Sequence, residues 1–309
     1  MSKPICFYHS ADLDGLCSGA IVLRNNPGCE MFGIDYGQEL PWSKVKDRDV
    51  IMVDFHLEPH SDMHRLAREC KSLVWVDHHA SAIKDQDENP VDGDHVTCLT
   101  SIDFAACELT WAFYNQDEDL GLMPMETPGF VYLLGRYDIW DKTNGWDTKV
   151  LPFQYGLRRL ANTVSSHVWQ QLFDDYNDIL LLNIIHEGKI ILDAQRQFNS
   201  KICRRAFTTT VRGVKFIAIN YPDSGSMVLD SVYDSEKHDG RLVFSNHKGK
   251  YWYVTMYSEK VDVSEIATYF GGGGHKGAAG FTCSKLPFIG AHPVFDNAVN
   301  RFGDNEADQ

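Results

Sequence analysis

The chain has 309 residues and a formal net charge of −14, with 43% hydrophobic and 23% charged residues. This is the composition of a globular protein long enough for two domains. It contains no run of about 18 apolar residues, which argues against a membrane span. The acidic total argues against the broad basic surface that holds long duplex nucleic acid, although a local basic patch can exist within an acidic chain.

The N-terminus and the cysteines predict a cytoplasmic protein. The apolar run near the N-terminus is interrupted by His9 and Asp12, so it lacks the central segment of a signal peptide. The eight cysteines are scattered and form no C-x-x-C pair. We therefore expect reduced, mostly buried thiols and neither a disulfide framework nor a zinc knuckle.

Strands and helices alternate in the first part of the chain. Apolar runs predict strands over residues 4–8, 49–55 and 72–77, and helical spacing predicts helices over 15–23 and 63–70. This order is typical of a mostly parallel sheet with helices on its faces.

The middle of the chain begins with a polar stretch, residues 80–100, which we expect to be a loop. Residues 103–115 then predict a buried helix, and the apolar segment 129–140 carries Asp138 near its end. Helical patterning continues through 167–205, and we interpret its second half as a linking helix.

The last part of the chain predicts hairpins within residues 207–220 and 241–258. A capping pair, Asp262 and Glu265, then opens a helix that ends at the glycines 271–274. The predicted organisation is a first domain over 1–185, a linking helix over 186–205, a smaller α/β domain over 206–302 and a disordered acidic tail over 303–309.

Carboxylates and histidines follow every strand predicted in the first domain. These residues are His9, Asp12, Asp14, Asp54, Asp77, His78 and His79, and the segment near 130–140 adds Asp138. Ligands of open α/β sheets bind outside the carboxyl ends of the strands, so these side chains should converge. Carboxylates mixed with imidazoles suit Mn²⁺, Fe²⁺, Co²⁺ or Zn²⁺, and two such ions about 3.5–4 Å apart can hold a phosphate and activate water.

Simpler interpretations exist for each residue taken alone. Asp12 or Asp14 could cap the helix that follows, and His78 and His79 could be surface histidines. The glycines at 271–274 could form a flexible loop that ends a helix, or they could let backbone N–H groups approach an anion. Three consecutive strand ends of the same chemistry favour the metal site.

The ordered motifs HSADLDG (9–15), VDF (53–55) and VDHH (76–79) resemble those of the DHH phosphoesterase superfamily. Further along, FGGGGHKGAAGF (270–281) resembles the signature of the DHHA1 domain that usually follows. The helix and fourth motif of the nanoRNase and cyclic-nucleotide phosphodiesterase branch are similar to SIDFAACELTWAFY (101–114) and GRYDIWD (135–141). The resemblance implies an α/β DHH domain, a linking helix and a smaller α/β DHHA1-like domain, with the active site in the cleft between the domains.

The resemblance also implies roles for individual residues. It implies one divalent cation held by His9 and Asp12 and a second held by Asp14, His78 and Asp138, with Asp54 as the bridging ligand. It also implies a catalytic pair, in which Asp77 orients its neighbours and His79 faces the phosphate. The metal of the family is mostly Mn²⁺, with Mg²⁺ or Co²⁺ as alternatives. The nucleotide would be gripped by Gly272, Gly273, Gly274, His275 and Lys276.

One position departs from the family pattern. Tyr257 stands near the place where the family often carries a phosphate-binding arginine. Tyr257 could instead stack on a base, and the missing charge could come from Lys260 or from an arginine elsewhere. The candidates for that arginine are Arg136, Arg158 and Arg159, although the last two could also form a solvated helix face.

These observations predict a metal-dependent 3′–5′ oligonucleotide exonuclease that cleaves di- to pentanucleotides to 5′-mononucleotides. A phosphodiesterase of cyclic mono- or oligonucleotide signals is the first alternative. A non-catalytic module that binds nucleotides is the second. The expected partner is a short oligonucleotide or a cyclic or linear dinucleotide, with no long duplex and no membrane, and the oligomeric state stays open, with a homodimer as one option.

Overall fold

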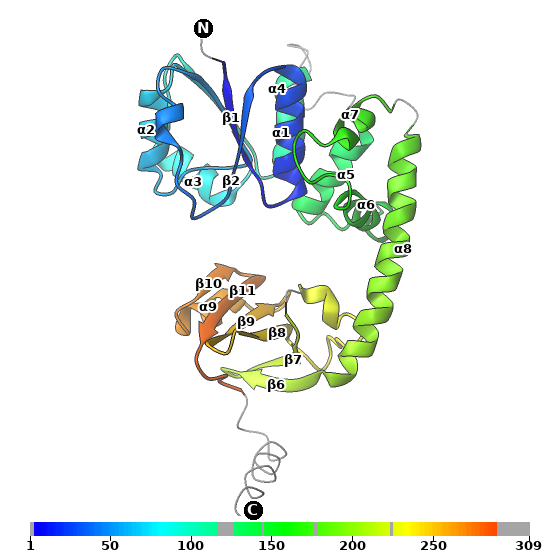
Figure 1. Cartoon of the computed structure of the whole chain (residues 1–309). Coiled ribbons are helices and arrows are strands. Elements are labelled where there is room, and N and C mark those ends of the chain that lie inside the picture. Colours follow the sequence, from blue (N-terminus) through cyan, green and yellow to red (C-terminus); the bar gives the residue numbers. More distant parts are fainter. Residues whose placement is uncertain (1–2, 116–126, 144, 176–177, 223–224, 289–309) are drawn as a thin grey trace, which may run out of the picture. The chain divides into compact units, whose positions relative to one another are not determined.

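A computed structural model describes residues 3–115, 127–143, 145–175, 178–222 and 225–288 (Figure 1). The chain divides into two compact units, Met1–Leu192 and Asp193–Gln309. The division falls inside the long helix α8 (Ile179–Ile202), within the linking helix that the sequence predicts. The predicted tail, 303–309, lies outside the described residues.

A five-stranded sheet lies at the centre of the first unit. Its strands are β1 (Ile5–His9), β2 (Glu30–Ile34), β3 (Asp49–Val53), β4 (Ser72–Asp77) and β5 (Val96–Thr100). All of them pair in parallel, in the order β2-β1-β3-β4-β5. The parallel sheet is therefore confirmed, and all its carboxyl ends lie at one edge.

Helices cover both faces of this sheet (Figure 1). On one face α2 (Ser61–Glu69) and α3 (Ala80–Glu88) pack on strand residues such as Phe7. On the other face α1 (Leu13–Asn25) and α4 (Ala106–Asn115) pack on residues such as Cys6. The alternation of side chains along each buried strand creates these two cores, as expected for a doubly covered sheet.

The remaining helices of the first unit extend the core beside α1. They are α5 (Gly129–Asp138), α6 (Leu151–Leu157), α7 (His167–Phe173) and the start of α8, with a π-helical turn at Trp146–Val150 and a 3₁₀ turn at Trp42–Lys44. Phe153 and Trp169 are buried among them. Helix α5 ends at Asp138, so the apolar segment 129–140 is a helix that delivers this carboxylate.

Two predictions for the first unit were incomplete. The stretch 80–100, expected to be a loop, contains α3 and β5, and the sequence pattern also missed β2. Strands β2 and β5 are the two edges of the sheet, where side chains are half-exposed and no continuous apolar run is needed. Helix α3 buries only Ala82, so its sequence has little helical periodicity.

The second unit contains a six-stranded sheet in the order β10-β11-β9-β8-β7-β6. Its strands are β6 (Phe207–Val211), β7 (Val214–Asn220), β8 (Gly240–His247), β9 (Tyr251–Tyr257), β10 (Gly273–His275) and β11 (Ala278–Cys283), and its short helices are α9 (Val263–Tyr269), Cys203–Arg205 and Ser226–Leu229. Neighbouring strands are antiparallel except for the parallel pair β7 and β8. Both predicted hairpins are confirmed, and Asp262 caps α9 by accepting a hydrogen bond from the backbone N of Ser264 (3.0 Å).

The glycine run is more ordered than a loop that ends a helix. Gly273 and Gly274 belong to β10, which pairs with β11. A Cβ atom at Gly272 would lie 2.1 Å from the backbone oxygen of Gly280, so only glycine allows the two chain segments to approach so closely. At Gly273, in contrast, a Cβ would meet nothing within 4 Å.

All eight cysteines lie among the described residues and are unpaired, as predicted. Six of them are buried. In the part of the chain that the structure describes, no helix is both long and apolar enough to cross a membrane.

A buried ion pair joins α4 to α5 in the first unit. Arg136 Nη2 lies 2.7 and 3.0 Å from the two carboxylate oxygens of Glu108, whose side chain is 2% exposed. We predict that Glu108→Ala lowers the free energy of unfolding by about 3–5 kcal/mol, because it leaves a buried guanidinium without its main counter-charge. Urea unfolding followed by tryptophan fluorescence measures this change, since six of the seven tryptophans lie in the first unit.

Glu187→Ala is the matched control. It breaks the ion pair with Arg159, in which both side chains are about half exposed, so we expect a loss below about 1 kcal/mol. Equal losses in the two variants would contradict the structural importance of the buried pair.

Candidate metal centre

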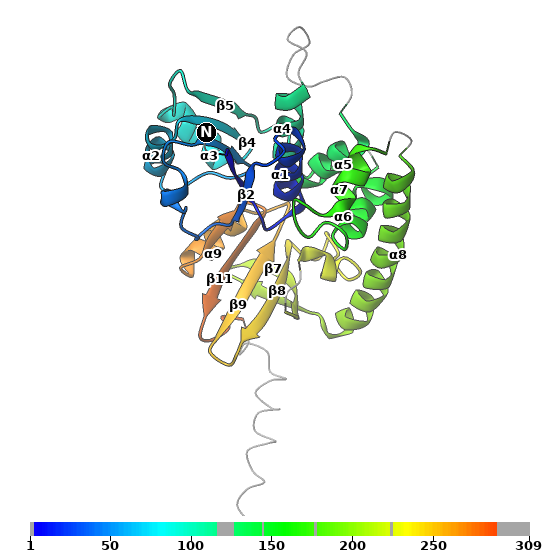
Figure 2. The same ribbon diagram turned by 45° about the horizontal axis from the view of Figure 1, so that its top comes forward.

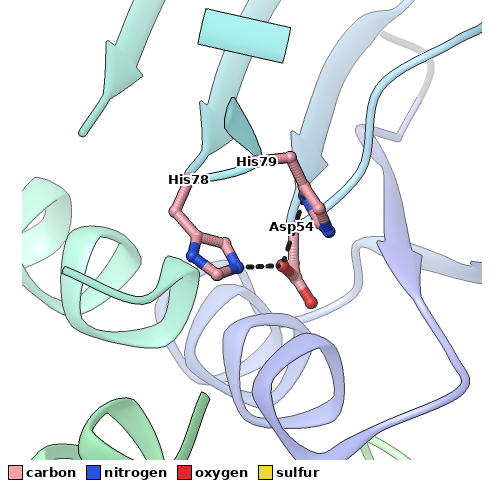
Figure 3. Close-up of side chains that lie close together, drawn as sticks. All are labelled: Asp54, His78 and His79. Carbon is pink, nitrogen blue, oxygen red and sulfur yellow. Dashed lines mark ion pairs between the residues drawn. The ribbon is translucent and has the colours of Figure 1, made fainter. Parts of the chain in front are cut away.

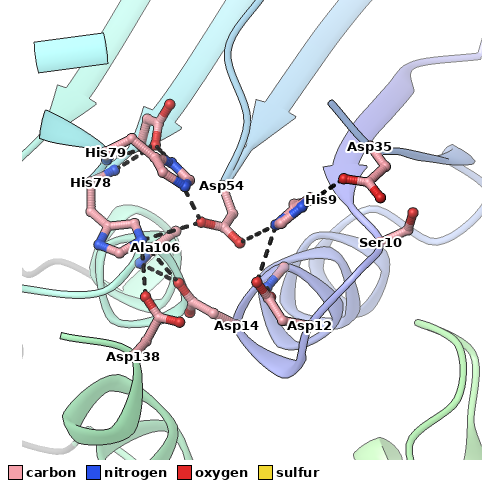
Figure 4. A network of polar contacts seen from close by, with 12 residues as sticks. His9, Ser10, Asp12, Asp14, Asp35, Asp54, His78, His79, Ala106 and Asp138 are labelled. Carbon is pink, nitrogen blue, oxygen red and sulfur yellow. Dashed lines mark hydrogen bonds and ion pairs between the residues drawn. The ribbon is translucent and has the colours of Figure 1, made fainter. Parts of the chain in front are cut away.

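The acidic and imidazole side chains predicted from the sequence gather at the carboxyl edge of the parallel sheet (Figure 4). His9 ends β1, Asp12 and Asp14 lie at the start of α1, Asp54 follows β3, Asp77 ends β4 and is followed by His78 and His79, and Asp138 ends α5. Since these elements share one sheet edge, residues up to 129 positions apart in the sequence become neighbours.

His9, Asp12 and Asp54 form the first group of potential ligands. His9 Nδ1 lies 3.2 Å from Asp12 Oδ2 and 3.5 Å from Asp54 Oδ2. The sequence-based assignment places these three residues around the first cation, and the structure brings them together as that assignment requires.

Asp14, His78 and Asp138 form the second group. His78 Nε2 lies 3.1 Å from Asp138 Oδ2 and 3.7 Å from Asp14 Oδ2. These are the three residues assigned to the second cation.

Asp54 lies between the two groups. Its Oδ2 faces His9, while its Oδ1 lies 3.4 Å from His78 Nε2 and 4.0 Å from His79 Nδ1 (Figure 3). The residue is 1% exposed and has a left-handed backbone conformation with φ of 55°. A non-glycine residue is seldom held in this conformation, so the surrounding structure must impose it.

The turn between β1 and α1 fixes two of the carboxylates. A Cβ atom at Gly15 would lie 2.1 Å from the backbone oxygen of His9, so this glycine lets the first turn of α1 lie against the end of β1. Asp12 Oδ1 accepts a hydrogen bond from the backbone N of Gly15 (3.0 Å) and caps α1. The capping interpretation of Asp12 is therefore correct, and it leaves Oδ2 directed at His9.

Asp14 is anchored to a different helix. Its two carboxylate oxygens accept hydrogen bonds from the backbone N atoms of Ala106 (2.9 Å) and Cys107 (2.8 Å), at the start of α4. Partial positive charge at a helix N-terminus stabilises such a carboxylate. These two bonds hold Asp14 in a fixed orientation beside His78.

The site concentrates negative charge that water cannot reach. Burial raises the pKa of Asp14 well above its usual value, and it also raises the pKa of Asp54. Burial alone would lower the pKa of His9, but its contacts with Asp12 and Asp54 outweigh this effect and raise the pKa to about 11. His78 behaves in the same way, and contacts with Asp138 and Asp54 raise its pKa to about 12. Positive charge, from protons or from metal ions, is therefore needed to stabilise these buried carboxylates.

The residues present fit two divalent cations that share Asp54. His9 Nδ1 and both carboxylate oxygens of Asp54 are buried without a hydrogen-bond partner among the described residues, which is costly unless a cation binds there. The ligand atoms of each group lie within 4.8 Å of one another. Imidazole and carboxylate donors together suit Mn²⁺ and its first-row neighbours.

Asp77 supports the two histidines that follow it. Its Oδ1 accepts hydrogen bonds from the backbone N of His78 (2.7 Å) and of His79 (3.0 Å), and it lies 2.6 Å from His79 Nδ1. Burial would raise the pKa of Asp77, but its contacts with His56 and His79 hold the pKa well below the usual range. This geometry agrees with the orienting role assigned to Asp77.

Sequence reasoning missed His56 and Tyr36. His56 is 2% exposed, and its Nδ1 lies 3.3 Å from Asp77 Oδ2 and 3.0 Å from the Tyr36 hydroxyl. His56, Asp77 and His79 form a further group of clustered donor atoms. The only signal for His56 was its position two residues after Asp54.

Asp35 was missed for a structural reason. Its Oδ1 lies 3.2 Å from His9 Nε2, so it contacts the imidazole nitrogen that faces away from Asp12 and Asp54. A carboxylate in this place fixes the orientation of a ligating histidine. Asp35 directly follows β2, the edge strand that the sequence pattern did not predict.

The four basic residues considered as substitutes for the missing arginine all have partners. Arg136 binds Glu108 and Asp141. The others are engaged as follows: Arg158 with the Tyr137 hydroxyl, Arg159 with Glu187, and Lys260 with the backbone oxygens of Ser235 and His238. A role for any of them in binding phosphate stays a prediction, as does the role of Arg136 in binding substrate.

Arg241 is a basic residue that sequence reasoning did not consider. It lies directly opposite Tyr257 in the β8–β9 register, with its guanidinium carbon 4.0 Å from the centre of the Tyr233 ring. Burial raises the pKa of the Tyr257 hydroxyl. Arg241 and Tyr257 thus place a cation and an aromatic ring side by side in the second unit, and Arg241 Nη2 also lies 3.4 Å from Asp230 Oδ1.

The glycine-rich motif also lies in the second unit. Gly273 and Lys276 are exposed, whereas Gly272 and Gly274 are required by close strand packing. The structure does not describe the side chain of His275. The assignment of these residues to the substrate stays a prediction.

Comparison with solved structures identifies a protein that shares the fold of this chain. A pGpG-specific phosphodiesterase, PggH from Vibrio cholerae, aligns over 97% of both chains with a TM-score of 0.50 and 12% sequence identity. The chain has the DHH/DHHA1 fold. The fold predicted from the motifs is thereby confirmed.

No protein-family model matches the chain. Uncharacterized protein R106 of Acanthamoeba polyphaga mimivirus is 24% identical over 259 residues, which are 79% of this chain and 55% of that protein, so the chain spans about half the length of this curated relative. RecJ of Thermus thermophilus, solved in complex with Mn²⁺, is 17% identical over 97% of this chain and 52% of RecJ, with a TM-score of 0.48.

The contact between Asp77 and His79 predicts a measurable pKa change. Burial lowers the pKa of His79, but contact with Asp77 outweighs burial and raises it. In Asp77→Asn the opposing negative charge is gone, so His79 should lose its proton at lower pH than in the wild-type protein. An NMR titration of the His79 ring in metal-free protein measures this shift.

Asp87→Asn is the control, because Asp87 is an exposed carboxylate on α3, the helix that follows His79. It should leave the pKa of His79 unchanged. An unchanged or raised His79 pKa in Asp77→Asn would show that Asp77 does not stabilise the charged imidazole.

Proposed function

We propose that the protein is a two-metal phosphodiesterase that hydrolyses short oligonucleotides to 5′-mononucleotides. The observation that carries the proposal is the pair of carboxylate–imidazole groups on either side of Asp54. Its buried carboxylate makes no hydrogen bond of normal geometry among the described residues, although the imidazoles of His9 and His78 lie 3.5 and 3.4 Å from it. A site built only for stability would pair this carboxylate with hydrogen-bond donors.

The chain's own residues would hold two ions at fixed places. His9, Asp12 and Asp54 would hold one, and Asp14, His78, Asp138 and the shared Asp54 would hold the other. Mn²⁺ is the proposed metal, with Mg²⁺ or Co²⁺ as alternatives. When bound, such ions neutralise charge on a phosphate and make water a better nucleophile near neutral pH.

The residues around the ligands would set the geometry. Asp35 and the backbone partners of Asp14 keep the ligands in place, so little reorganisation is needed when a substrate binds. His79 is 31% exposed at its side chain and is oriented by Asp77, so it is the group placed to donate a hydrogen bond to a phosphate oxygen.

A nucleotide diester is the proposed substrate class. The structurally similar Vibrio cholerae protein is described as a phosphodiesterase specific for pGpG, which supports a small nucleotide over a long polymer. In the second unit, Tyr257 and Arg241 offer a ring and a cation to a nucleotide, and the exposed Gly273 leaves its backbone open to an anion. Cyclic nucleotides are the alternative substrates, and a cytoplasmic location stays a prediction.

The proposal predicts that Asp54→Asn lowers kcat for dinucleotide hydrolysis by at least about a thousandfold, because the shared ligand loses its charge. The assay compares labelled di- to decanucleotides with cyclic mono- and dinucleotides in Mn²⁺, with the products resolved. We expect 5′-mononucleotides and the highest kcat/KM for di- to pentanucleotides.

Asp62→Asn is the control, because Asp62 is a partly exposed carboxylate in the first turn of α2 and belongs to neither ligand group. It should leave kcat unchanged. Preference for cyclic compounds would favour the alternative substrate class. Tight nucleotide binding without turnover by the wild-type protein would assign a binding module instead, and full activity in Asp54→Asn would contradict the proposed site.

A further inference from the structure

The six-stranded sheet of the second unit has two different faces. Side chains alternate along β9, so Val254 and Met256 point into the core formed with α9. Tyr251 and Tyr253 lie on the opposite face. Neither tyrosine belongs to a hydrophobic core among the described residues, and Tyr253 is 45% exposed.

Three rings form an ordered group on this face, near the turn that joins β8 to β9. The ribbon in Figure 2 shows the course of these two strands. His247 lies opposite Tyr251 in the strand register. Their ring centres are 5.0 Å apart and the planes are inclined by 22°, while the rings of Tyr251 and Tyr253 are 5.2 Å apart. The two tyrosine hydroxyls lie 3.3 Å from each other. We call His247, Tyr251 and Tyr253 the hairpin aromatic cluster.

The turn beside the cluster presents lysines where other residues would be more stable. Lys250 N donates to His247 O (2.9 Å), and the two turn residues, Lys248 and Gly249, have φ values of 50° and 74°. A two-residue hairpin turn of this type favours Asn-Gly, because asparagine tolerates positive φ better than lysine does. The lysine at position 248 thus costs stability and contributes a positive charge.

The charge of the hairpin differs from that of the whole chain. Residues 240–258 contain Arg241, Lys248 and Lys250 but no aspartate or glutamate, in a chain with a net charge of −14. Both lysines of the turn are exposed. Arg241 lies at the far end of the hairpin and pairs with Asp230, so the turn with Lys248 and Lys250 is the local basic patch, and exposed rings lie beside it.

We propose that the hairpin aromatic cluster, with Lys248 and Lys250, is a binding site for single-stranded nucleic acid. Bases stack on Tyr251 and Tyr253, and the lysines pair with the phosphates, which is the combination that binds single strands without sequence preference. The hydrogen-bonded tyrosines are already held in place, so less side-chain entropy is lost on binding.

If the protein is the proposed phosphodiesterase, this site would let it bind strands longer than a dinucleotide. That statement about substrate length rests on the proposed function, whereas the binding of single strands does not. A cyclic mononucleotide has one base and cannot occupy several rings. The site therefore favours ligands with several bases over cyclic mononucleotides. Binding can be measured without catalysis, so the two proposals fail or succeed separately.

The test measures the affinity of the full chain for fluorescently labelled hexauridylate and hexathymidylate by anisotropy, in EDTA so that no strand is cleaved. Tyr253→Ala should weaken binding about tenfold, since one stacking contact is lost. Tyr253→Phe keeps the ring but loses the hydroxyl contact with Tyr251, so it should bind more tightly than Tyr253→Ala and no more tightly than the wild-type protein. The two oligonucleotides show whether the site prefers RNA or DNA.

Lys248→Asn provides a second variant that cannot fail by disrupting the turn, since asparagine suits positive φ. The slope of log affinity against log salt concentration should fall by about 0.7 in this variant, the contribution of one phosphate contact in a single strand. Thermal unfolding by circular dichroism checks that each variant is folded.

Four results would overturn the proposal. The first is no binding of either hexamer by the wild-type protein, and the second is unchanged affinity in both Tyr253→Ala and Tyr251→Ala. The third is an unchanged salt slope in Lys248→Asn. The fourth is a tyrosine variant that changes its oligomeric state while its affinity for the hexamers stays the same. The last result would assign the cluster to self-association. Absence of dinucleotide hydrolysis in the wild-type protein would contradict the proposed catalytic function while leaving the binding result intact.

Discussion

The structure of the first unit depends on how it compensates a buried negative charge. Asp14 and Asp54 are almost completely shielded from water at the carboxyl edge of the parallel sheet, and burial raises the pKa of both. His9 and His78 supply protons that balance this charge, which is why their pKa values rise to about 11 and 12. Metal ions can replace these protons, since a histidine must be neutral to bind a metal. The same residues thus explain both a stable metal-free fold and a site that attracts cations.

Local backbone features serve this arrangement. Gly15 brings the start of α1 against β1, and the start of α4 anchors Asp14 through two backbone N–H groups. Asp54 is held in a left-handed conformation between the two ligand groups. Each feature costs conformational freedom or strain, and each places a carboxylate within reach of a second group.

Much of this could be predicted from the sequence. The central strands are buried on both faces and therefore appear as apolar runs, and the residues that follow them are the ligand candidates. The edge strands β2 and β5 could not be found in this way, because they are half-exposed and their sequences carry no such run. Missing β2 meant missing Asp35. His56 was missed because its importance comes from its contact with Asp77, which only the three-dimensional structure reveals.

The distribution of charge reconciles an acidic protein with the anionic substrate that we propose. The first unit does not need a basic surface if cations bound by its carboxylates meet the phosphate. In the second unit the positive charge is local, at Arg241 beside Tyr257 and at the turn of the β8–β9 hairpin. Net charge describes the surface as a whole and therefore gives no information about these two places.

The central claim is that Asp54 joins two metal ions in one site. Electron paramagnetic resonance of protein titrated with Mn²⁺ tests this claim most directly, because two Mn²⁺ ions bridged by one carboxylate, about 3.5–4 Å apart, are magnetically coupled. The account predicts two ions per chain and the spectrum of a coupled pair. One ion per chain, or two ions with uncoupled spectra, would contradict it.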